Sequence, residues 1–330
     1  MAKARALDKR RKSVKSIRKI TRTMELVATA QFKKSMELAV AADAYTKRLV
    51  ELVHDLSTSG QELSHPLLVE RNQPKEQKDV TLLVLSANRG MCGGFNSGVM
   101  RLAYQRLAQL RENYSGVSLE VSGKRGISAF KFKKANIVKE YIHLQDKPQM
   151  ELVTELAEHY VEDFLADKID RLDVCYMKFE SMGKQYPVVE TLLPLTELTA
   201  EGDVNAIKEE VKVDLKQAAL VKQADEMTKD RKDKGAAGLK SLGNVQFEFL
   251  PSPESILEEL VPKAFNSKLF KCFLDSAVGE QIARMTAMKA ATDNADQMIT
   301  MLTTAYNRAR QSQITNEITE IIGGADALEN

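Results

Sequence analysis

Apolar and small side chains recur at intervals of three and four residues along the first part of the chain. No Gly or Pro occurs from Asp8 to about Leu56. The recurring positions are Ile17, Ile20, Met24, Val27, Leu38, Ala42, Tyr45, Leu49, Leu52 and Leu56. This spacing predicts one helix with a heptad-like seam, interrupted by a local stutter through Val27, Gln31 and Ser35. At ~1.5 Å per residue, the helix would be ~75 Å long.

A second long helix is predicted at the other end. After Pro262 no proline occurs, and only Gly279 interrupts the pattern before Gly323 and Gly324. The same rhythm runs through Val278, Met285, Met288, Thr292, Ala295, Ile299, Leu302, Tyr306 and Ala309. A globular domain cannot bury two such helices along their whole length, so we expect them to pack on each other as an antiparallel coiled coil. From periodicity alone, an ordinary helical hairpin is an equal alternative.

Many of the predicted seam positions carry small side chains. They are Ala28, Ala42, Thr292, Ala295 and Ala309. Small residues let two helices approach closely, but they bury less apolar surface than the Leu and Ile of a tight zipper. The sequence therefore predicts a slender pair.

Between the two helices, strand and helix patterns alternate. Strands are expected at 80–86, 117–121, 137–142, 172–179 and 186–193, and helices at 95–112, near 127–132 and at 150–165. This order predicts a mostly parallel, Rossmann-like α/β sheet with a late hairpin. The predicted fold class is thus α/β, with a long antiparallel coiled coil attached.

Four segments follow from these patterns. Residues 1–58 form the N-terminal helix, 78–198 the α/β middle domain, 199–244 a charged helical or flexible insertion, and 245–330 the C-terminal segment with the second long helix. Within the last segment we expect a short strand at 245–250, then a short helix starting at Glu254 and capped by Ser252, separate from the long helix.

Composition narrows the class of protein. The 330 residues are enough for about two domains, and 6% aromatic residues with no Trp favour helix-rich packing. Cys92, Cys175 and Cys272 are far apart and odd in number, which indicates neither a disulfide framework nor a zinc site. No apolar stretch approaches the ~20 residues of a membrane span, and the N-terminus has no signal-peptide core.

Charge is concentrated at the N-terminus. Net charge is only +2, yet residues 1–34 contain twelve Lys and Arg against Asp8 and Glu25. A basic helix of this kind fits an acidic protein partner, a solvated face or a nucleic acid. Lys9 to Lys12 loosely resembles a basic zipper, but no base-reading pattern accompanies it, so nucleic acid is the weakest of the three.

One glycine cluster lies where nucleotide-binding folds hold phosphate. GMCGGFN, with Gly90, Gly93 and Gly94, separates the first strand from its helix but matches neither GxGxxG nor GxxxxGK[ST]. A structural turn is therefore favoured over a phosphate loop. Cys92 has no His near it in sequence, and no metal-ligand or GxSxG motif is present, so we predict no catalytic residue, cofactor or metal.

Both ends of the chain resemble a known family. ITRTMELVATAQFKKS (20–35) and ARMTAMKAATDNADQMITMLTTAYNRARQSQITNEITEIIGGA (283–325) closely resemble the signature ends of the gamma subunit of rotary F-type ATP synthases, bacterial type. GMCGGFN also resembles that family's GLCGGFN, with Met91 replacing a usual Leu. The matches cover both long helices and the first strand-turn-helix of the middle.

The resemblance implies a non-catalytic rotor. The paired helices would stand inside a ring of alternating alpha and beta subunits, and the middle domain would sit on the membrane c-ring with the epsilon subunit. Delta would be present in the whole complex, with one copy of this chain. Rotation would couple transmembrane ion flow to ATP synthesis or hydrolysis at the beta subunits. This role implies no nucleic-acid partner.

The resemblance also implies contact residues for the alpha and beta ring. Acidic loops of the beta subunits would face the basic side chains of the first helix. Met24 matches a buried methionine near the lower bearing, facing Arg284 and the turn at Glu280. Arg310 and Gln311 match a pair that engages a loop of an empty beta subunit. The expected contacts are Arg10, Lys12, Lys15, Arg18, Arg22, Met24, Lys33, Arg284, Arg310, Gln311, Thr315, Glu317 and Glu320. The apolar, small tail 318–328 would suit a low-friction sleeve.

Two further expectations concern regulation and location. Photosynthetic members carry a regulatory insertion with a cysteine pair near 199–244, but this segment has no Cys. We therefore expect a steric or regulatory projection or a tolerated loop, without thiol switching. A chain that starts at Met1 without a transit peptide indicates a bacterial peripheral protein on the cytoplasmic face of the plasma (inner) membrane, with a mature organellar form as the alternative.

Overall fold

The computed structural model describes residues 2–58, 65–69, 79–144, 148–195 and 253–329. They fall into two compact units. Unit 1 is Met1–Ala30 with Arg284–Asn330, and unit 2 is Gln31–Ala283. The insertion at 199–244, the expected strand at 245–250 and the expected cap at Ser252 lie outside the described residues.

Two long helices contribute to both units. They are α1 (Ala2–Thr58) and α6 (Pro253–Glu329). The predicted separate helix before Pro262 is wrong, because this proline lies inside α6. An interior proline costs about 3 kcal/mol, whereas burying a Val or Phe side chain contributes about 1.5–3 kcal/mol. Val261 and Phe265 are both fully buried, so packing of this turn offsets the cost of the proline.

Unit 2 contains one five-stranded sheet. Its strands are β1 (Asp79–Leu85), β2 (Gly116–Ser122), β3 (Lys139–Tyr141), β4 (Arg171–Ser181) and β5 (Lys184–Leu193). The order is β3-β2-β1-β4-β5, with parallel pairing except between β4 and β5. The predicted mostly parallel sheet with a late hairpin is confirmed.

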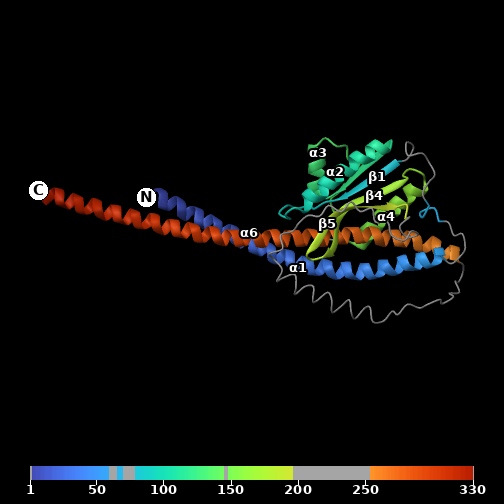
Figure 1. Cartoon of the computed structure of the whole chain (residues 1–330), viewed down its shortest axis with the longest axis horizontal. Coiled ribbons are helices and arrows are strands. Elements are labelled where there is room, and N and C mark those ends of the chain that lie inside the picture. Colours follow the sequence, from blue (N-terminus) through green and yellow to red (C-terminus); the bar gives the residue numbers. More distant parts are fainter. Residues whose placement is uncertain (1, 59–64, 70–78, 145–147, 196–252, 330) are drawn as a thin grey trace. The chain divides into compact units, whose positions relative to one another are not determined.

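Helices cover both faces of this sheet. α2 (Phe95–Asn113) and α3 (Lys124–Phe132) lie on one face, and α4 (Met150–Leu165) and part of α6 lie on the other (Figure 1). β1 shows why both layers are needed, because Leu82 and Val84 belong to the hydrophobic cluster under α2 while Leu83 and Leu85 belong to the opposite one. A strand buried on both faces is typical of a parallel sheet.

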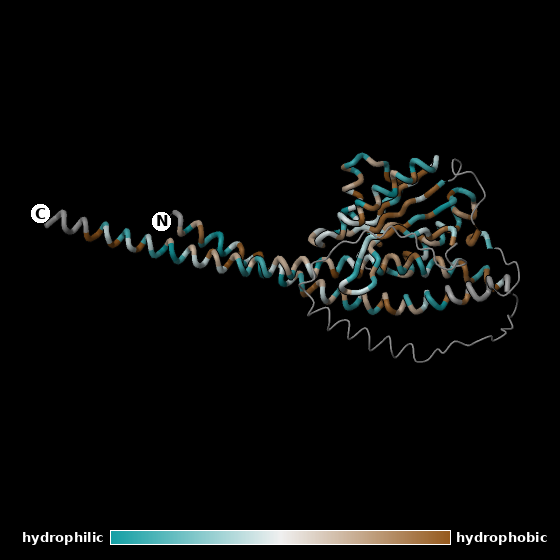
Figure 2. The backbone as a smooth tube through the Cα atoms, viewed as in Figure 1, coloured by the Kyte–Doolittle hydropathy of each residue, from teal (hydrophilic) through white to brown (hydrophobic). Residues whose placement is uncertain are grey.

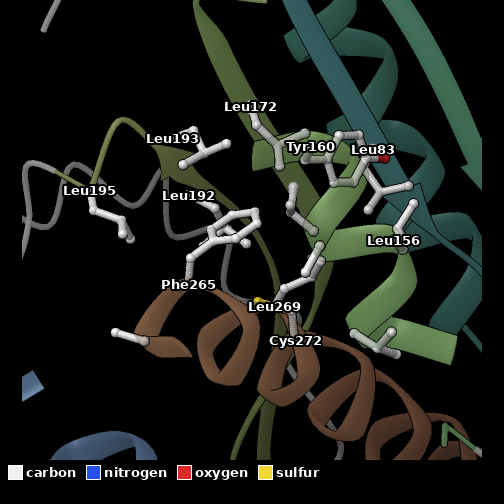
Figure 3. Close-up of a cluster of buried hydrophobic side chains, with 14 of the residues drawn as sticks. Leu83, Leu156, Tyr160, Leu172, Leu192, Leu193, Leu195, Phe265, Leu269 and Cys272 are labelled. Atoms are coloured by element: carbon white, nitrogen blue, oxygen red, sulfur yellow. The ribbon is translucent and has the colours of Figure 1, made fainter. Parts of the chain in front are cut away.

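The larger cluster joins α6 to the sheet. Figure 3 shows Phe265, Leu269 and Cys272 of α6 facing side chains from α4 and the β4–β5 hairpin. Tyr160 of α4 is 2% exposed, and its hydroxyl donates a hydrogen bond to Glu120 Oε2 at 2.5 Å. Because Phe265, Leu269 and Cys272 are buried in this cluster, α6 is a core element of the α/β domain in unit 2.

α1 pairs with α6 within unit 2 as well. Thr46 and Ser267 share a buried hydroxyl hydrogen bond of 2.7 Å, and Lys271 Nζ donates to Asp43. Ala39 of α1 packs in a third cluster with Leu274, Val278 and Ile282 of α6.

None of the helices in the described part of the chain has both the length and the apolar composition of a membrane span.

Candidate partner-contact surface and glycine turn

In unit 1, α1 and α6 form an antiparallel pair. Thr292 Oγ1 donates to Thr21 Oγ1 at 2.8 Å, and Arg18 Nε forms an ion pair of 2.5 Å with Asp296. Further toward the N-terminus, the Arg11 guanidinium lies 4.8 Å from the centre of the Tyr306 ring. Position numbers rise on one helix as they fall on the other, which defines the antiparallel direction.

The predicted seam is confirmed on α6. Met288, Thr292 and Ala295 are buried, and the remaining predicted positions from Met285 to Ala309 are half-buried. The buried positions are small or flexible, as expected for a slender pair. Figure 2 shows hydrophobic and hydrophilic residues alternating along both helices rather than forming long apolar runs.

The predicted seam is only partly right on the N-terminal half of α1: Ala28 is buried and Met24 is half-buried, but the predicted large apolar positions are exposed. Val14, Thr21 and Ala28 are buried at intervals of seven, whereas Ile17 and Ile20 are 52% and 59% exposed. The large apolar residues recur regularly, but they lie beside the line along which α1 contacts α6, which is here called the contact line. The contact line itself is occupied by small and hydroxyl side chains, because these let the backbones approach.

This displacement divides the surface of α1 into two stripes. At 3.6 residues per turn, successive side chains are ~100° apart, which places the exposed Ile17, Ile20 and Val27 roughly 60–140° to one side of Val14. Lys15, Arg18 and Arg22 lie roughly 40–100° to the other side by the same measure. We call these the apolar stripe (Ile17, Ile20, Val27) and the basic stripe (Lys15, Arg18, Arg22).

The expected basic contacts of α1 are exposed and only partly paired within the chain. Lys12 is 74% exposed and pairs with Asp8 at 2.9 Å, and Arg22 is 58% exposed and pairs with Glu25 at 2.8 Å. A hydrogen bond from Lys12 holds the pKa of Asp8 below its usual value. Arg10 and Lys15 are also exposed. Exposed pairs of this kind contribute about 0–1 kcal/mol each, so an external acidic group can compete for these cations.

Three expected contacts differ from the rest. Lys33 is exposed but belongs to unit 2. Met24 is half-buried within the helix pair, and Arg284 is buried, at 7% exposed. Arg284 in this conformation is therefore part of the helix pair rather than an outward-facing cation.

The C-terminal part of α6 extends past the N-terminus of α1 (Figure 1). Its expected contacts are all exposed, namely Arg310, Gln311, Thr315, Glu317 and Glu320. Large apolar side chains are exposed there too, at Ile314, Ile318, Ile321 and Ile322. Their spacing of three and four places them on one side of the helix.

The glycine turn holds itself together. Met91 and Gly93 adopt left-handed backbone angles, with φ of 61° and 54°. Asn96 closes the turn, because its Oδ1 accepts from the Ala87 amide at 3.0 Å and its Nδ2 donates to Cys92 Sγ at 3.1 Å. Cys92 is 2% exposed. A Cβ at Gly90 would lie 3.0 Å from the Arg125 guanidinium, so a larger residue there would require this flexible side chain to shift.

α6 packs at the place where doubly wound folds bind their ligands. The strand order reverses between β1 and β4, and such a switch point is the usual crevice. Gly279 of α6 lies against it, since a Cβ there would be 3.0 Å from Met177 Cγ and 3.7 Å from Phe95 Cε2. Phe95 is the first residue of α2, so the chain itself fills this position. This packing supports the structural interpretation of the glycine turn.

Comparisons with known proteins give the family. The model of the family described as ATP synthase matches residues 3–328. The ATP synthase gamma chain of Rhodopirellula baltica is 47% identical over 329 residues, covering 100% of both chains, and that of Leptospira biflexa is 36% identical over 99% of this chain and 100% of its own. The chain belongs to the ATP synthase gamma-chain family. Members are the gamma subunits of ATP synthase, the non-catalytic central stalk of F1.

The gamma-chain fold is also found in distant solved structures. A chain of the Euglena gracilis mitochondrial ATP synthase matches with a TM-score of 0.59 at 15% identity, over 99% of this chain and 95% of its own. A chain of the Tetrahymena thermophila enzyme matches with a TM-score of 0.50 at 16% identity, over 82% of this chain. These likenesses show the long paired helices and the α/β middle.

Sequence reasoning missed two features of this gamma chain. Apolar spacing predicts that the residues of the apolar stripe lie inside the helix pair, and only the burial of Val14, Thr21 and Ala28 shows otherwise. The helical pattern gives Gly279 only as an interruption of the helix. Its signal was available, because an isolated glycine within a helical pattern indicates close packing.

Proposed function

We propose that this chain is the central rotor of an F1 sector and couples ion flow across a membrane to ATP synthesis or hydrolysis by rotating inside a ring of alpha and beta subunits. Family membership supports the role. One structural observation carries the surface assignment: unit 1 leaves large apolar residues exposed on both helices, including Ile20 at 59% and Ile321 at 71%. Exposed apolar patches of this kind mark interaction sites.

The two stripes of α1 suggest how the ring would hold the rotor. The apolar stripe would slide against apolar side chains without fixed hydrogen bonds. The basic stripe would meet acidic loops of the beta subunits, where each exposed ion pair is weak and easily remade. Because the stripes lie on opposite sides of the seam, each beta subunit would meet a different surface as the angle changes. Rotation would thereby bias nucleotide affinity among the beta subunits.

The expected contacts keep their proposed roles. Arg10, Lys12, Arg18, Arg22 and Lys33 would face acidic groups of the ring. Arg310, Gln311, Thr315, Glu317 and Glu320 would engage it near the tip. The apolar residues from Ile314 onward would turn in a sleeve formed by the alpha and beta subunits.

Unit 2 would serve as the platform of the rotor. It would rest on the c-ring together with the epsilon subunit, with delta elsewhere in the complex and one gamma chain per complex. Gly279 and its contacts with Met177 and Phe95 would help hold α6 in that platform. We place the complex at the cytoplasmic face of a bacterial plasma membrane. The segment 199–244 would act as a regulatory projection or a tolerated loop.

Reconstitution tests the role. The purified chain should show no ATP turnover by itself, and should support sustained turnover when mixed with alpha and beta subunits. Hydrolysis by the chain alone would instead indicate an enzyme, and stable self-association through the helix pair without ring binding would indicate an adaptor.

A substitution in the tip separates partner contact from folding. Ile314→Ser combined with Ile318→Ser should lower torque and the ATPase rate of the assembled complex while leaving the helix content of the isolated chain unchanged. Thr300→Ser is a matched control, since Thr300 is exposed on the same helix. Unchanged torque in the double variant, or in a chain lacking 311–330, would contradict the proposed sleeve.

A further inference from the structure

A group of partly buried charges surrounds one buried carboxyl group where α1, α6 and the β4–β5 hairpin meet in unit 2. It contains three carboxyl groups and two lysines, with a tyrosine and a cysteine beside them. We call it the junction cluster, and its charged members are Asp43, Lys178, Glu190, Lys271 and Asp275. Asp275 is the most deeply buried of the three acidic residues, at 4% exposed.

Two of the three carboxyl groups have their own cations. Lys178 Nζ lies 2.6 Å from Glu190 Oε1, and the Tyr176 hydroxyl donates to Glu190 Oε2 at 3.0 Å. Asp43 pairs with Lys271 and, from the solvent side, with the exposed Lys47 at 2.7 Å. Both lysines that face the interior are therefore already engaged.

Asp275 is the carboxyl group left over. Among the described residues, no cation lies within ion-pair distance of it, and its Oδ2 has no hydrogen-bond partner. The groups that face it are Lys271 and Cys272 from its own helix, Asp43 from α1, Tyr176 and Lys178 from β4, and Glu190 from β5. An ionised carboxylate in such a position would lose its hydration without a direct ion pair to replace it, at a cost of several kcal/mol.

We propose that Asp275 is a proton-binding site, and that the bound proton sets how firmly α6 is seated on the β4–β5 hairpin. With the proton in place, the carboxyl group is neutral and the three elements pack closely. When the proton leaves, the new charge repels Asp43 and Glu190 and demands water or a share of Lys271. The packing of α6 at this junction then loosens.

The surroundings place this change at a pH that cells experience. Burial is the main reason that the pKa of Asp275 is raised to about 7; Glu190 and Asp43 add to the rise, and Lys271 and Lys178 oppose it. The pKa of the unfolded chain would be the ordinary 3.8. The folded state therefore holds a proton that the unfolded state has lost, so this group makes stability fall as pH rises from about 4 to about 7 and level off above that.

Infrared difference spectra of the full chain test the proton site. Between pH 5.5 and pH 8.5 the wild type should lose the C=O stretch of a protonated carboxyl group, with a midpoint near pH 7. Asp275→Asn should lack the titrating band. Asp43→Asn should keep the band and shift its midpoint to lower pH, because a like charge is removed and Lys271 becomes available to Asp275.

Two spectroscopic outcomes would contradict the proposal. A wild-type spectrum without a titrating carboxyl band, or a band that persists in Asp275→Asn, would show that another group or none binds the proton. Asp43→Asn keeps the test usable if Asp275→Asn does not fold, because a midpoint that fails to move also contradicts the assignment.

Hydrogen exchange tests the effect on α6. After correction for the intrinsic pH dependence of exchange, amides of α6 around Asp275 should be less protected at pH 8.5 than at pH 6 in the wild type, and equally protected at both in Asp275→Asn. Protection that does not change with pH in the wild type would contradict the seating of α6 by the proton. The inference does not depend on the proposed rotor role, which is tested by reconstitution.

Discussion

The two units use the same pair of helices in different ways. In unit 2, α1 and α6 pack into an α/β domain whose described residues contain three clusters of buried hydrophobic side chains. Unit 1 consists of the helix pair itself, and its buried hydrophobic residues among those described are Val14, Ala28, Met288 and Ala295. At ~25 cal/mol per Å² of buried apolar surface, four residues, two of them alanines, supply much less stabilisation than the clusters of unit 2.

The two units therefore obtain their stability from different sources. Unit 2 encloses its own core, so its apolar residues are mostly hidden. Unit 1 exposes Ile17, Ile20 and Val27 while burying Thr21 and Ala28. A helix pair built in this way gains further stability only when another surface covers it, which fits a shaft that works inside partners. The following substitutions should separate the two regimes.

The largest effect is expected in the core of unit 2. Phe265 of α6 is fully buried against the sheet, and Phe265→Ala should lower the free energy of unfolding of unit 2 by about 3–5 kcal/mol through lost burial and the cavity left behind. Urea unfolding of the full chain, followed by circular dichroism, measures it. Phe132→Ala is the matched control, because Phe132 is 89% exposed and its loss should change stability by less than about 0.5 kcal/mol. Equal effects would contradict the assigned core.

The next effect concerns the contact between α6 and the switch point of the sheet. Gly279→Leu would force a side chain into space held by Met177 and Phe95, and overpacking of this kind costs about 1–3 kcal/mol. Thermal unfolding of the full chain should show a lower transition for unit 2. Gly94→Leu is a comparison, because a Cβ at Gly94 meets only Ser97 Oγ at 3.9 Å. A variant at Gly279 as stable as the wild type would mean that α6 is not tightly seated there.

The sequence predicts the strands and helices of unit 2 well for a physical reason. The buried stretches of β1 and β4 are largely apolar, and the buried residues of α2 and α4 recur at helical spacing, so local pattern and tertiary burial agree. β1 is an example, since the expected 80–86 is observed as Asp79–Leu85. Pro262 is the exception, because only the packing of Val261 and Phe265 reveals that the helix continues through it.

The surface of unit 1 could be predicted only in part. Exposure of Arg22 or Arg310 follows from charge alone. The contact line of α1 does not follow from apolar spacing, because α1 has two rows of apolar or small side chains. Only one of these rows faces α6. The small residues Ala28 and Thr21 mark that line, whereas Ile20 marks the other. The exposed apolar stripe therefore could not be told from the contact line by apolar spacing, whereas the basic stripe has one partner across the helix pair, since Arg18 pairs with Asp296.

A smaller effect is expected at the seam of unit 1. Thr292→Val keeps the shape of the side chain but removes the hydrogen bond that Thr292 Oγ1 donates to Thr21 Oγ1, at a cost of about 1 kcal/mol. Amide hydrogen exchange of unit 1 should detect it as faster opening of both helices near the contact. Thr300→Val is the control, because Thr300 is exposed and its hydroxyl donates only to the Asp296 carbonyl of its own helix, at 3.1 Å. Indistinguishable exchange in the two variants would place the seam elsewhere.

The smallest effect on the isolated chain is expected from Ile20→Ser. Ile20 is 59% exposed on the apolar stripe, so its replacement should change the free energy of unfolding by less than about 0.5 kcal/mol. The assembled complex with alpha and beta subunits should respond more strongly, with a lower ratio of ATP synthesis to ion flow, since the ring would lose an apolar contact with the shaft.

Leu165→Ser is the control for this contrast, because Leu165 is an apolar residue of unit 2 with a similar exposure of 51%. A complex that couples normally with Ile20→Ser would remove the apolar stripe from the proposed contact surface. Loss of stability in the isolated chain would instead restore Ile20 to the interior of the helix pair. The two outcomes differ because a residue that contacts only a partner affects the assembled complex alone. A residue that packs inside the helix pair also affects the stability of the isolated chain.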